Sequence, residues 1–404
     1  MERAEKHLIK ADWVLTGDGE TVLEKGAVVL EGKRILAVGE AARLERKFPE
    51  AQIQELKGCT LMPGLIDMHT HIGWEKDDRP DRYGIRLQLL ALSCGKRMEE
   101  TIQAGVTTVR DVGSPDGVVP ALKEAAKAGY IRSPRIFTGL RALCMTGGHG
   151  AESLGVKEVD GVSEIRKAVR ENLQKGADLI KLMDSEGYRG EEFSQEELDA
   201  AVAEAHRFHV RVAAHAGYDP SMKMCIQAGC DTIEHGTHLT VEEALRMKEN
   251  DQTWVPTMYV FHYVCEQVKQ SQFASMAEHI GYLEDAVESY REHFKELYDT
   301  GVRVAAGTDT ECAGHPQAST MANECQLMVT YGITPVQAVC CATHHGAEAL
   351  GMGTELGLLK EGYLADLTAV RGNVSEKIEA LSAVEAVWQE GTCVYESESA
   401  LLHP

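Results

Sequence analysis

The sequence lacks the features that would place it in a membrane or in an oxidising compartment. No segment approaches the ~20 consecutive apolar residues that a membrane-spanning helix needs, and the first ten residues, MERAEKHLIK, lack the apolar run of a signal peptide. The 11 cysteines are scattered and include no C-x-x-C pair. We therefore expect neither a disulfide framework nor a zinc–thiolate site, and predict reduced thiols in a cytoplasmic protein.

Positive charge is also scarce. The 41 lysines and arginines stand against 63 acidic residues, which gives a formal net charge of -22. Such an acidic surface argues against nucleic acid and anionic membranes as partners. No solenoid-type repeat or low-complexity stretch is visible. At 404 residues the chain exceeds what one ordinary core fills, so a large barrel-type domain with a smaller unit is expected.

Both ends of the chain have the pattern of short strands. Clusters of β-branched residues, broken by Gly-Asp and Gly-Lys turns, occupy roughly residues 7–62, and the pattern returns at 363–370 and 384–395. We therefore predict that residues 1–62 and 355–404 join into one small sheet domain, with residues 63–354 forming the domain between them.

The middle of the chain alternates apolar, strand-like runs with longer amphipathic segments. One such segment, 194–209, opens with Ser194 and carries Glu197 three residues later, which is a capping-box signal. The strand-like runs number eight: LIDMHTHI, TTVRDVG, RIFTG, LIKLM, VRVAAHA, TIEHG, WVPTM and VRVAAGTD. Eight strand–helix units are typical of a (β/α)8 barrel, so we predict an α/β fold of this kind.

Chemistry-bearing side chains stand at the ends of these runs, where such barrels build their active face. Two histidines at i and i+2 on one strand face the same side, so both can reach one ion. A carboxylate at a strand end can bind metal and also take a proton from bound water. Taken alone, the histidine pair is as typical of an ordinary strand end as of a metal site, and each of the three later residues is more typical of an ordinary polar strand end. Together, and in this order, five of them favour a metal site: His69, His71, His215, His235 and Asp309.

Lys181 lies inside ADLIKLMD, a run that should be a buried strand. A bare ammonium is costly there, so the residue must reach water, pair with a carboxylate such as Asp184, or be chemically altered. Carboxylation by CO2 would turn it into an anionic carbamate that can bridge two metal ions about 3.5–4 Å apart. The pattern alone leaves these alternatives open.

The motifs PGLIDMHTHI, TVRDVG, TGGHG, IKLM, AAHA, TIEHGTHL, AAGTD and GLLKEGYLADL together resemble the amidohydrolase superfamily. The closest subgroup is the imidazolonepropionase-like and Xaa-Pro dipeptidase-like hydrolases, which include prolidases, aminoacyl-arginine carboxypeptidases and ochratoxin-cleaving amidases. The resemblance covers nearly the whole chain. It implies a distorted (β/α)8 barrel and a small β-sandwich domain built from both termini.

The resemblance also implies two divalent ions, usually zinc, with six ligands: His69, His71, Lys181, His215, His235 and Asp309. His69 and His71 would bind the more buried ion together with Asp309, and the two later histidines would bind the other. Lys181, as the carbamate, would bridge both. A bridging hydroxide would attack a carbonyl, and Asp309 would pass its proton to the leaving amine as general base and acid.

Two further residues are expected to contact substrate. His149 lies in the glycine-rich loop TGGHG, and the family resemblance implies that a histidine there contacts substrate or the transition state. Tyr218 follows His215 by three positions, whereas the peptidase-like relatives place a tyrosine two positions after this histidine. The run after Lys181 also departs from the usual small, glycine-rich sequence. Substrate preference is therefore expected to differ from that of characterised relatives.

The function predicted from these residues is hydrolysis of a C–N amide bond in a dipeptide or N-acyl amino acid with a free carboxylate. A ring-opening hydrolase of cyclic amides, imidazolonepropionase-like, is the alternative. A mononuclear deaminase is less favoured, because an H-x-x-E element is absent after His215. A non-catalytic scaffold would have lost ligands, and none is lost here. The partner is a small molecule, and a homo-oligomer is compatible with the resemblance.

Overall fold

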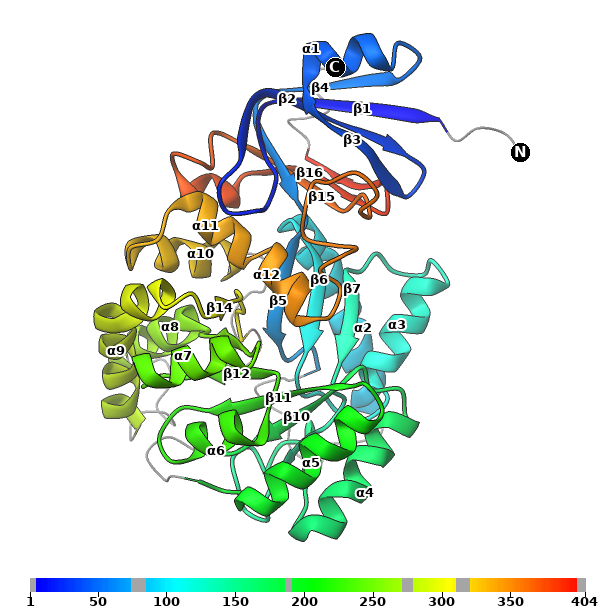
Figure 1. The fold of residues 1–404 in the computed structure, drawn as a ribbon. Coiled ribbons are helices and arrows are strands. Elements are labelled where there is room, and N and C mark those ends of the chain that lie inside the picture. The colour runs from blue at the N-terminus through cyan, green and yellow to red at the C-terminus, as the bar shows by residue number, and fades with distance from the viewer. Residues whose placement is uncertain (1–4, 74–84, 186–190, 271–278, 310–319, 398–404) are drawn as a thin grey trace.

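A computed structural model describes residues 5–73, 85–185, 191–270, 279–309 and 320–397 of the chain. Figure 1 shows a sheet made from both ends of the chain, set above a larger α/β body that carries the middle of the sequence. The predicted α/β class, with parallel strands in the middle and a separate terminal sheet, is confirmed.

The terminal sheet joins the two ends of the chain. Its seven strands run in the order β17-β16-β15-β4-β1-β2-β3. They are β1 (Lys6–Leu15), β2 (Val22–Glu31), β3 (Arg34–Glu40), β4 (Gln52–Pro63), β15 (Leu367–Arg371), β16 (Val384–Gln389) and β17 (Thr392–Glu396). β15 pairs with β4 in antiparallel register, with Leu367 opposite Pro63. Only the β1–β4 pairing in this sheet is parallel.

The body contains all eight predicted strands. They are β5 (Leu65–Thr70), β6 (Val106–Asp111), β7 (Arg135–Thr138), β10 (Leu179–Met183), β11 (Arg211–Ala216), β12 (Thr232–His235), β13 (Thr253–Val255) and β14 (Arg303–Val304). Two short strands, β8 (Ala142–Cys144) and β9 (Val156–Glu158), lie between β7 and β10 in sequence. The strands form two sheets, β5-β6-β7 and β14-β13-β12-β11-β10-β8-β9, and every pairing is parallel.

Backbone hydrogen bonds connect the two sheets at both edges. The Asp178 N–H, before β10, donates to the Thr138 carbonyl at the end of β7 at 2.7 Å. On the other side, the Met68 N–H of β5 donates to the Ala306 carbonyl, just after β14, at 3.0 Å. The eight strands therefore follow one another around a closed but irregular ring, as a distorted barrel requires.

Helices surround this ring (Figure 1). They are α2 (Ile85–Gln103), α3 (Val118–Lys127), α4 (Gly161–Gln174), α5 (Gln195–Arg207), α6 (Ser221–Ala228), α7 (Val241–Glu249), α8 (Met258–Lys269), α9 (Ile280–Asp299), α10 (Thr320–Thr330), α11 (Pro335–Cys341) and α12 (His344–Ala349). A short helix, α1 (Ala41–Lys47), joins β3 to β4, and a 3-10 turn spans Ile378–Ser382. The predicted capping box is confirmed at α5, where Ser194 and Glu197 exchange hydrogen bonds.

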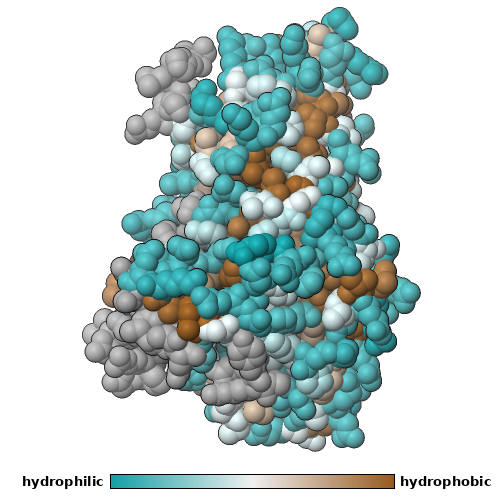
Figure 2. Space-filling view, turned by 90° about the vertical axis from the view of Figure 1, so that its left-hand side faces the viewer, coloured by the Kyte–Doolittle hydropathy of each residue, from teal (hydrophilic) through white to brown (hydrophobic). Residues whose placement is uncertain are grey.

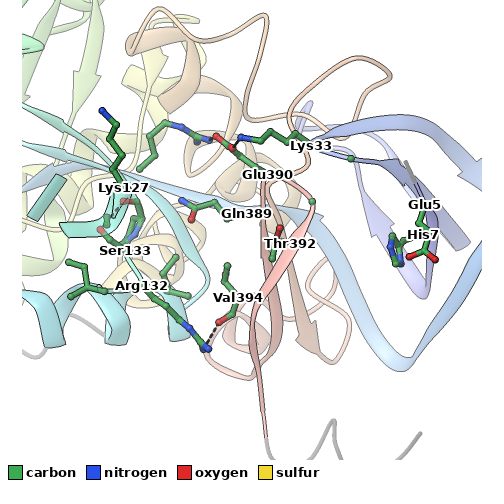
Figure 3. Close-up of a pocket in the computed structure, with 17 residues that line it drawn as sticks. Glu5, His7, Lys33, Lys127, Arg132, Ser133, Gln389, Glu390, Thr392 and Val394 are labelled. Carbon is green, nitrogen blue, oxygen red and sulfur yellow. Dashed lines mark hydrogen bonds and ion pairs between the residues drawn. The ribbon is translucent and has the colours of Figure 1, made fainter. Parts of the chain in front are cut away.

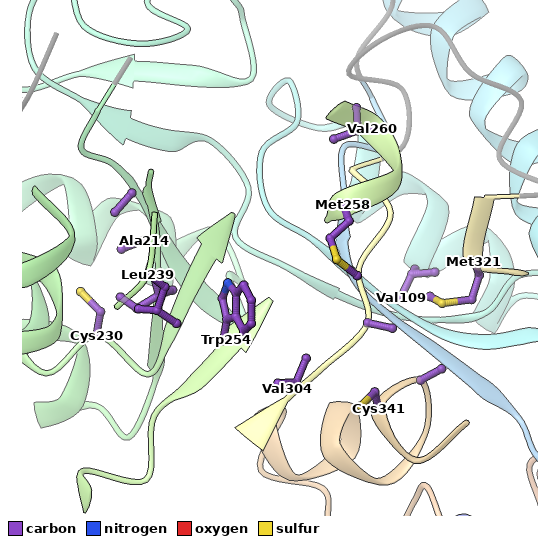
Figure 4. Packing of buried hydrophobic residues seen from close by; sticks show 14 of the residues in the cluster. Val109, Ala214, Cys230, Leu239, Trp254, Met258, Val260, Val304, Met321 and Cys341 are labelled. Carbon is purple, nitrogen blue, oxygen red and sulfur yellow. The ribbon is translucent and has the colours of Figure 1, made fainter. Parts of the chain in front are cut away.

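The main apolar core lies between the barrel strands and these helices. Figure 4 shows part of it, with Trp254, Leu239 and Met258 packed around β11 to β14. Trp254 is fully buried. A second cluster, which includes Leu61, Leu367 and Trp388, fills the terminal sheet. The main core also includes Leu15, Met62 and Val370 of the terminal sheet, so it extends from the barrel into that sheet.

The surface is largely hydrophilic on the face that Figure 2 shows, where apolar residues form small separate groups. In the described part of the chain, no helix has both the length and the apolar character needed to cross a membrane. Ten cysteines in that part are free thiols; nine of them are buried, and Cys393 is exposed. Adjacent Cys340 and Cys341 are both free, in keeping with the reduced thiols that the sequence predicts.

Candidate metal centre

The predicted ligands converge where the barrel strands end. The side-chain ligand atoms of His69, His235 and Asp309 lie within 4.8 Å of one another, and all three residues are buried. His69 comes from β5, His235 ends β12, and Asp309 follows β14. His69 and Asp309, which are 240 positions apart in sequence, thus meet because parallel barrel strands bring their carboxyl ends to one face.

The backbone at this face departs from strand geometry. β13 and β14 end at Val255 and Val304, earlier than the runs WVPTM and VRVAAGTD predict. His235, Thr257 and Asp309 all adopt left-handed backbone conformations, with φ of 66°, 51° and 52°. Such conformations are uncommon for residues other than glycine and gather at functional sites. They break the alternation of a strand and let side chains turn toward the cluster.

Gly307 allows the segment that carries Asp309 to lie close against β5. A Cβ on Gly307 would lie 2.8 Å from the Cβ of His69 and 2.7 Å from a methyl carbon of Val255. The Asp309 N–H then donates to the His69 carbonyl at 2.8 Å. The glycine therefore sets how near the carboxylate of Asp309 comes to the first histidine pair.

His69, His71 and Asp309 present acceptor atoms to one another. His71 Nδ1 lies 3.0 Å from the Gly113 carbonyl, and His69 Nδ1 lies 2.7 Å from a carboxylate oxygen. Since both partners only accept, each Nδ1 carries the proton and each neutral ring keeps a lone pair on Nε2. These two nitrogens lie 3.4 and 3.5 Å from Asp309 Oδ1. That buried oxygen has no hydrogen-bond partner among the described residues.

Three electron-pair donors without a proton between them repel one another, and a cation at their centre would remove the repulsion. Imidazole nitrogens and a carboxylate oxygen are also the ligand types that zinc prefers. The donor set of His69, His71 and Asp309 therefore fits a divalent metal ion.

His235 is held from two sides. Its Nδ1 lies 2.7 Å from the hydroxyl of Thr257. Its carbonyl accepts hydrogen bonds from the indole of Trp254 at 2.7 Å and from the hydroxyl of Tyr290 at 3.1 Å. Two buried aromatic residues thus stabilise the strained backbone that aims this imidazole at the cluster.

The remaining predicted histidines adjoin His235 through ring contacts. The rings of His215 and His235 are 4.4 Å apart, and the ring of His149 lies 4.4 Å from that of His215. The backbone N–H of His149 donates to the carboxylate of Glu192 at 2.9 Å, which anchors its loop. The structure therefore brings His149, predicted as a substrate contact, beside the candidate ligands.

Lys181 is completely buried in the middle of β10. Its charge acts on the surrounding imidazoles: it is among the causes that lower the pKa of His69, His149 and His215. Asp184, the alternative partner for this lysine, is engaged elsewhere. Its carboxylate accepts from the Phe193 N–H at 2.8 Å and from the thiol of Cys225 at 3.4 Å.

Tyr218 lies outside the group of imidazoles. Its hydroxyl donates to Asp285 at 3.0 Å, and its ring stacks on His238 with centroids 4.3 Å apart. The residue is half-buried, and its ring also contacts Tyr282. Tyr218 stands one position later after His215 than the tyrosine of the peptidase-like relatives, and here its hydroxyl is hydrogen-bonded to Asp285.

The electrostatics of the site favour neutral histidines beside an ionised carboxylate. Burial lowers the pKa of His149 and His235 to about 4, and it holds those of His69 and His215 well below their usual range. For Asp309, burial by itself raises the pKa, but the nearby His69 and its neighbours outweigh it and hold the pKa well below its usual range. Neutral imidazoles and an ionised carboxylate are the protonation states that metal binding needs.

Sequence reasoning missed two charged residues behind this site, Arg110 and Glu234. Both are buried; Arg110 Nη2 lies 2.7 Å from Glu234 Oε1, and Glu234 Oε2 is the oxygen that faces His69 Nδ1. The signal was present in the sequence, since both stand inside strand-like runs, TTVRDVG and TIEHG. Like Lys181, each is a charged residue in a predicted buried strand, where a charge is costly unless it is paired.

A large cavity lies away from the histidine cluster, between the terminal sheet and the barrel (Figure 3). It has a volume of about 940 Å³, and no predicted site residue lines it. Three of its charged residues pair with one another, because Glu390 contacts both Lys33 and Arg135. The predicted ligands lie elsewhere, at the ends of the barrel strands.

The chain is similar to amidohydrolases both in family models and in individual proteins. The Amidohydrolase family matches residues 60–394, and the Imidazolonepropionase-like composite domain of bacteria matches residues 26–51. Ochratoxinase of Aspergillus niger is 31% identical over 429 aligned positions, covering 96% of this chain and 87% of that protein. Imidazolonepropionase of Sphingopyxis alaskensis is 24% identical over 388 positions, covering 87% and 88%.

Solved structures resemble the chain over nearly its whole length. A crystal structure of a Xaa-Pro dipeptidase with methionine bound in its active site superposes with a TM-score of 0.86 at 30% identity, covering 97% of this chain and 100% of that one. The crystal structure of A. niger ochratoxinase gives a TM-score of 0.84 at 29% identity, covering 98% and 97%.

Proposed function

The chain belongs to the amidohydrolase family and is a hydrolase of C–N bonds, and we propose that it cleaves the amide bond of a dipeptide or N-acyl amino acid. The similarity to a Xaa-Pro dipeptidase and to ochratoxinase supports a linear amide. The partial match to an imidazolonepropionase-like domain keeps a cyclic amide as the second candidate.

The observation that carries the proposal is the closeness of three acceptor atoms. Asp309 Oδ1 lies 3.5 Å from His69 Nε2 and 3.4 Å from His71 Nε2. In this proposal His69, His71 and Asp309 hold one divalent ion. His215 and His235 would hold the other ion, also zinc by preference. Lys181, as its carbamate, would be a ligand shared by both ions. Bound metal supplies Lewis acidity, which polarises a carbonyl and lowers the pKa of water.

The protein residues then handle the proton and the substrate. Asp309, whose pKa lies well below its usual range, would accept a proton from the attacking water and return it to the leaving nitrogen. The carbonyl carbon gains the C–O bond and loses the C–N bond, so a carboxylic acid and an amine are released. His149, neutral at physiological pH, donates a hydrogen bond to the substrate. Its Nδ1 is buried and has no hydrogen-bond partner among the described residues.

Tyr218 is the second proposed substrate contact. Its hydroxyl is engaged with Asp285, so contact with substrate requires exchange of that hydrogen bond. The small-molecule partner, the cytoplasmic location and a homo-oligomeric state stay predictions from the sequence, as does the division into residues 1–62 plus 355–404 and 63–354.

Substrate screening tests this proposal directly. We would assay zinc-loaded protein against dipeptides, N-acyl amino acids and cyclic amides, with the Asp309→Asn protein purified in parallel to exclude contaminating peptidases. We expect the highest kcat/KM on a linear amide with a free carboxylate. Preference for a cyclic amide would establish the second candidate instead. Failure to hydrolyse any of the three classes would contradict both.

A further inference from the structure

Behind the first candidate ligand, Glu234 accepts three hydrogen bonds in the barrel interior. Its Oε2 faces His69 Nδ1 at 2.7 Å, and its Oε1 accepts from Arg110 Nη2 at 2.7 Å and from the hydroxyl of Thr232. The carboxylate is fully buried, and its three partners are at most 3% exposed. A buried charge that is satisfied this completely has one fixed orientation.

Arg110 fixes that orientation and also the backbone before His69. Its Nε donates to the Met68 carbonyl at 2.5 Å, and its Nη1 donates to the Thr232 hydroxyl at 2.9 Å. The three donors of one planar guanidinium therefore tie β6 to the backbone of β5 and to two side chains of β12. The ring of His69 is held through its own chain and through Glu234 together.

This geometry selects one form of the His69 ring. A carboxylate only accepts, so Nδ1 must carry the proton, and the neutral ring then keeps its lone pair on Nε2. That atom points toward Asp309 Oδ1, 3.5 Å away. With the opposite tautomer, Nε2 would carry a hydrogen and could not bind a metal ion.

We propose that Arg110 and Glu234 are positioning residues, which hold His69 as the Nδ1–H tautomer and thereby set the zinc affinity of the His69–His71–Asp309 site. The inference rests on the proposed metal site, because only there does the freed Nε2 have a use. Carboxylate partners behind metal-binding histidines act in this way in general, and their loss weakens metal binding about 10–100-fold.

Glu234→Gln tests the proposal, because glutamine has nearly the same size and shape as glutamate but carries no charge. Arg110 and Thr232 retain the amide oxygen on their side, so the amide NH2 faces His69 and favours the wrong tautomer. We expect zinc binding, measured by competition with a chromophoric chelator, to weaken about 10–100-fold. The matched control is Glu204→Gln, which removes a buried glutamate bonded twice by Arg170, at 2.7 and 3.1 Å, between α4 and α5.

The control separates positioning from stability. If Glu204→Gln loses comparable urea resistance but keeps wild-type zinc affinity, the effect of Glu234→Gln acts through the site. Unchanged zinc affinity in folded Glu234→Gln would overturn the proposal, as would an equal loss in both variants.

A second measurement uses metal-free wild-type protein, so it does not depend on metal binding or on whether a variant at position 234 folds. In metal-free wild-type protein with 15N-labelled histidine, the His69 ring, assigned by its loss in His69→Asn, should show a protonated Nδ1 and an unprotonated Nε2. A ring protonated at Nε2 overturns the inference. This readout also separates it from the proposed function, which fails instead if wild-type protein binds no zinc.

Discussion

The two sides of the candidate metal centre are built differently. Around His69 and His71, each imidazole is fixed by an acceptor, Glu234 or the Gly113 carbonyl, and Asp309 is tied to the His69 backbone. Around His215, the contacts are between rings, 4.4 Å from both His149 and His235. On this second side His235 is also anchored by the Thr257 hydroxyl, so the difference lies in His215, and we expect the His215 ring to take its final arrangement from what it binds.

The largest effect is expected at Lys181, the proposed ligand shared by the two sides. Lys181→Ala should abolish turnover and remove one of two bound ions, because the carbamate is the proposed bridge between them. Activity and metal content would be measured together, with Lys123→Ala as control, since Lys123 pairs with Asp178 at the surface.

Short carboxylic acids can replace the missing carbamate, so adding them should restore part of the activity of Lys181→Ala. Full turnover in that variant without any added acid would show that the second side does not depend on Lys181.

On the organised side, Asp309→Asn should lower kcat about 10²–10⁴-fold, the range expected for loss of a general base. The side chain keeps its size, so the fold should persist, which circular dichroism would check. Hydrolysis at the wild-type rate would rule out Asp309 as the proton acceptor.

Graded chelation sharpens the comparison itself. Dialysis against increasing concentrations of a chelator should remove the ion at His215 before the ion at His69 and His71. Ligands held by supporting contacts bind metal more tightly, and loss of such contacts typically weakens metal binding about 10–100-fold. The ion that remains should be lost in His71→Ala and retained in His215→Ala. Simultaneous loss of both ions would mean that the two sides do not differ.

The smallest effect is expected at Gly307. Gly307→Ala places a methyl group 2.8 Å from the Cβ of His69, and we expect about 1–3 kcal/mol lower stability toward urea. Gly39→Ala, in β3 with no atom within 4 Å of the new methyl group, is the matched control. Equal stability of the two variants would contradict the close approach of the Asp309 segment to β5.

The sequence predicted the eight barrel strands and the terminal sheet because each strand is a short apolar run bounded by turn residues, which is a local signal. It did not predict where β14 ends. The left-handed backbone at Asp309 depends on Gly307 packing against β5, a contact between residues 238 positions apart.

The candidate ligands were predictable for a similar reason, since His69 and His71 share one strand and each later ligand follows an apolar run. Their supporting contacts were not. The pairing of Arg110 with Glu234 spans two strands that are not neighbours in the ring, so no local pattern encodes it. Only the three-dimensional structure tells which buried charge meets which histidine.

Metal analysis combined with a refined electron-density map tests the central claim most directly. Protein purified without chelators and analysed by mass spectrometry should contain two divalent ions per chain, and the map should show extra density on the Lys181 side chain. One ion per chain with an unmodified Lys181 would contradict the account of a binuclear hydrolase.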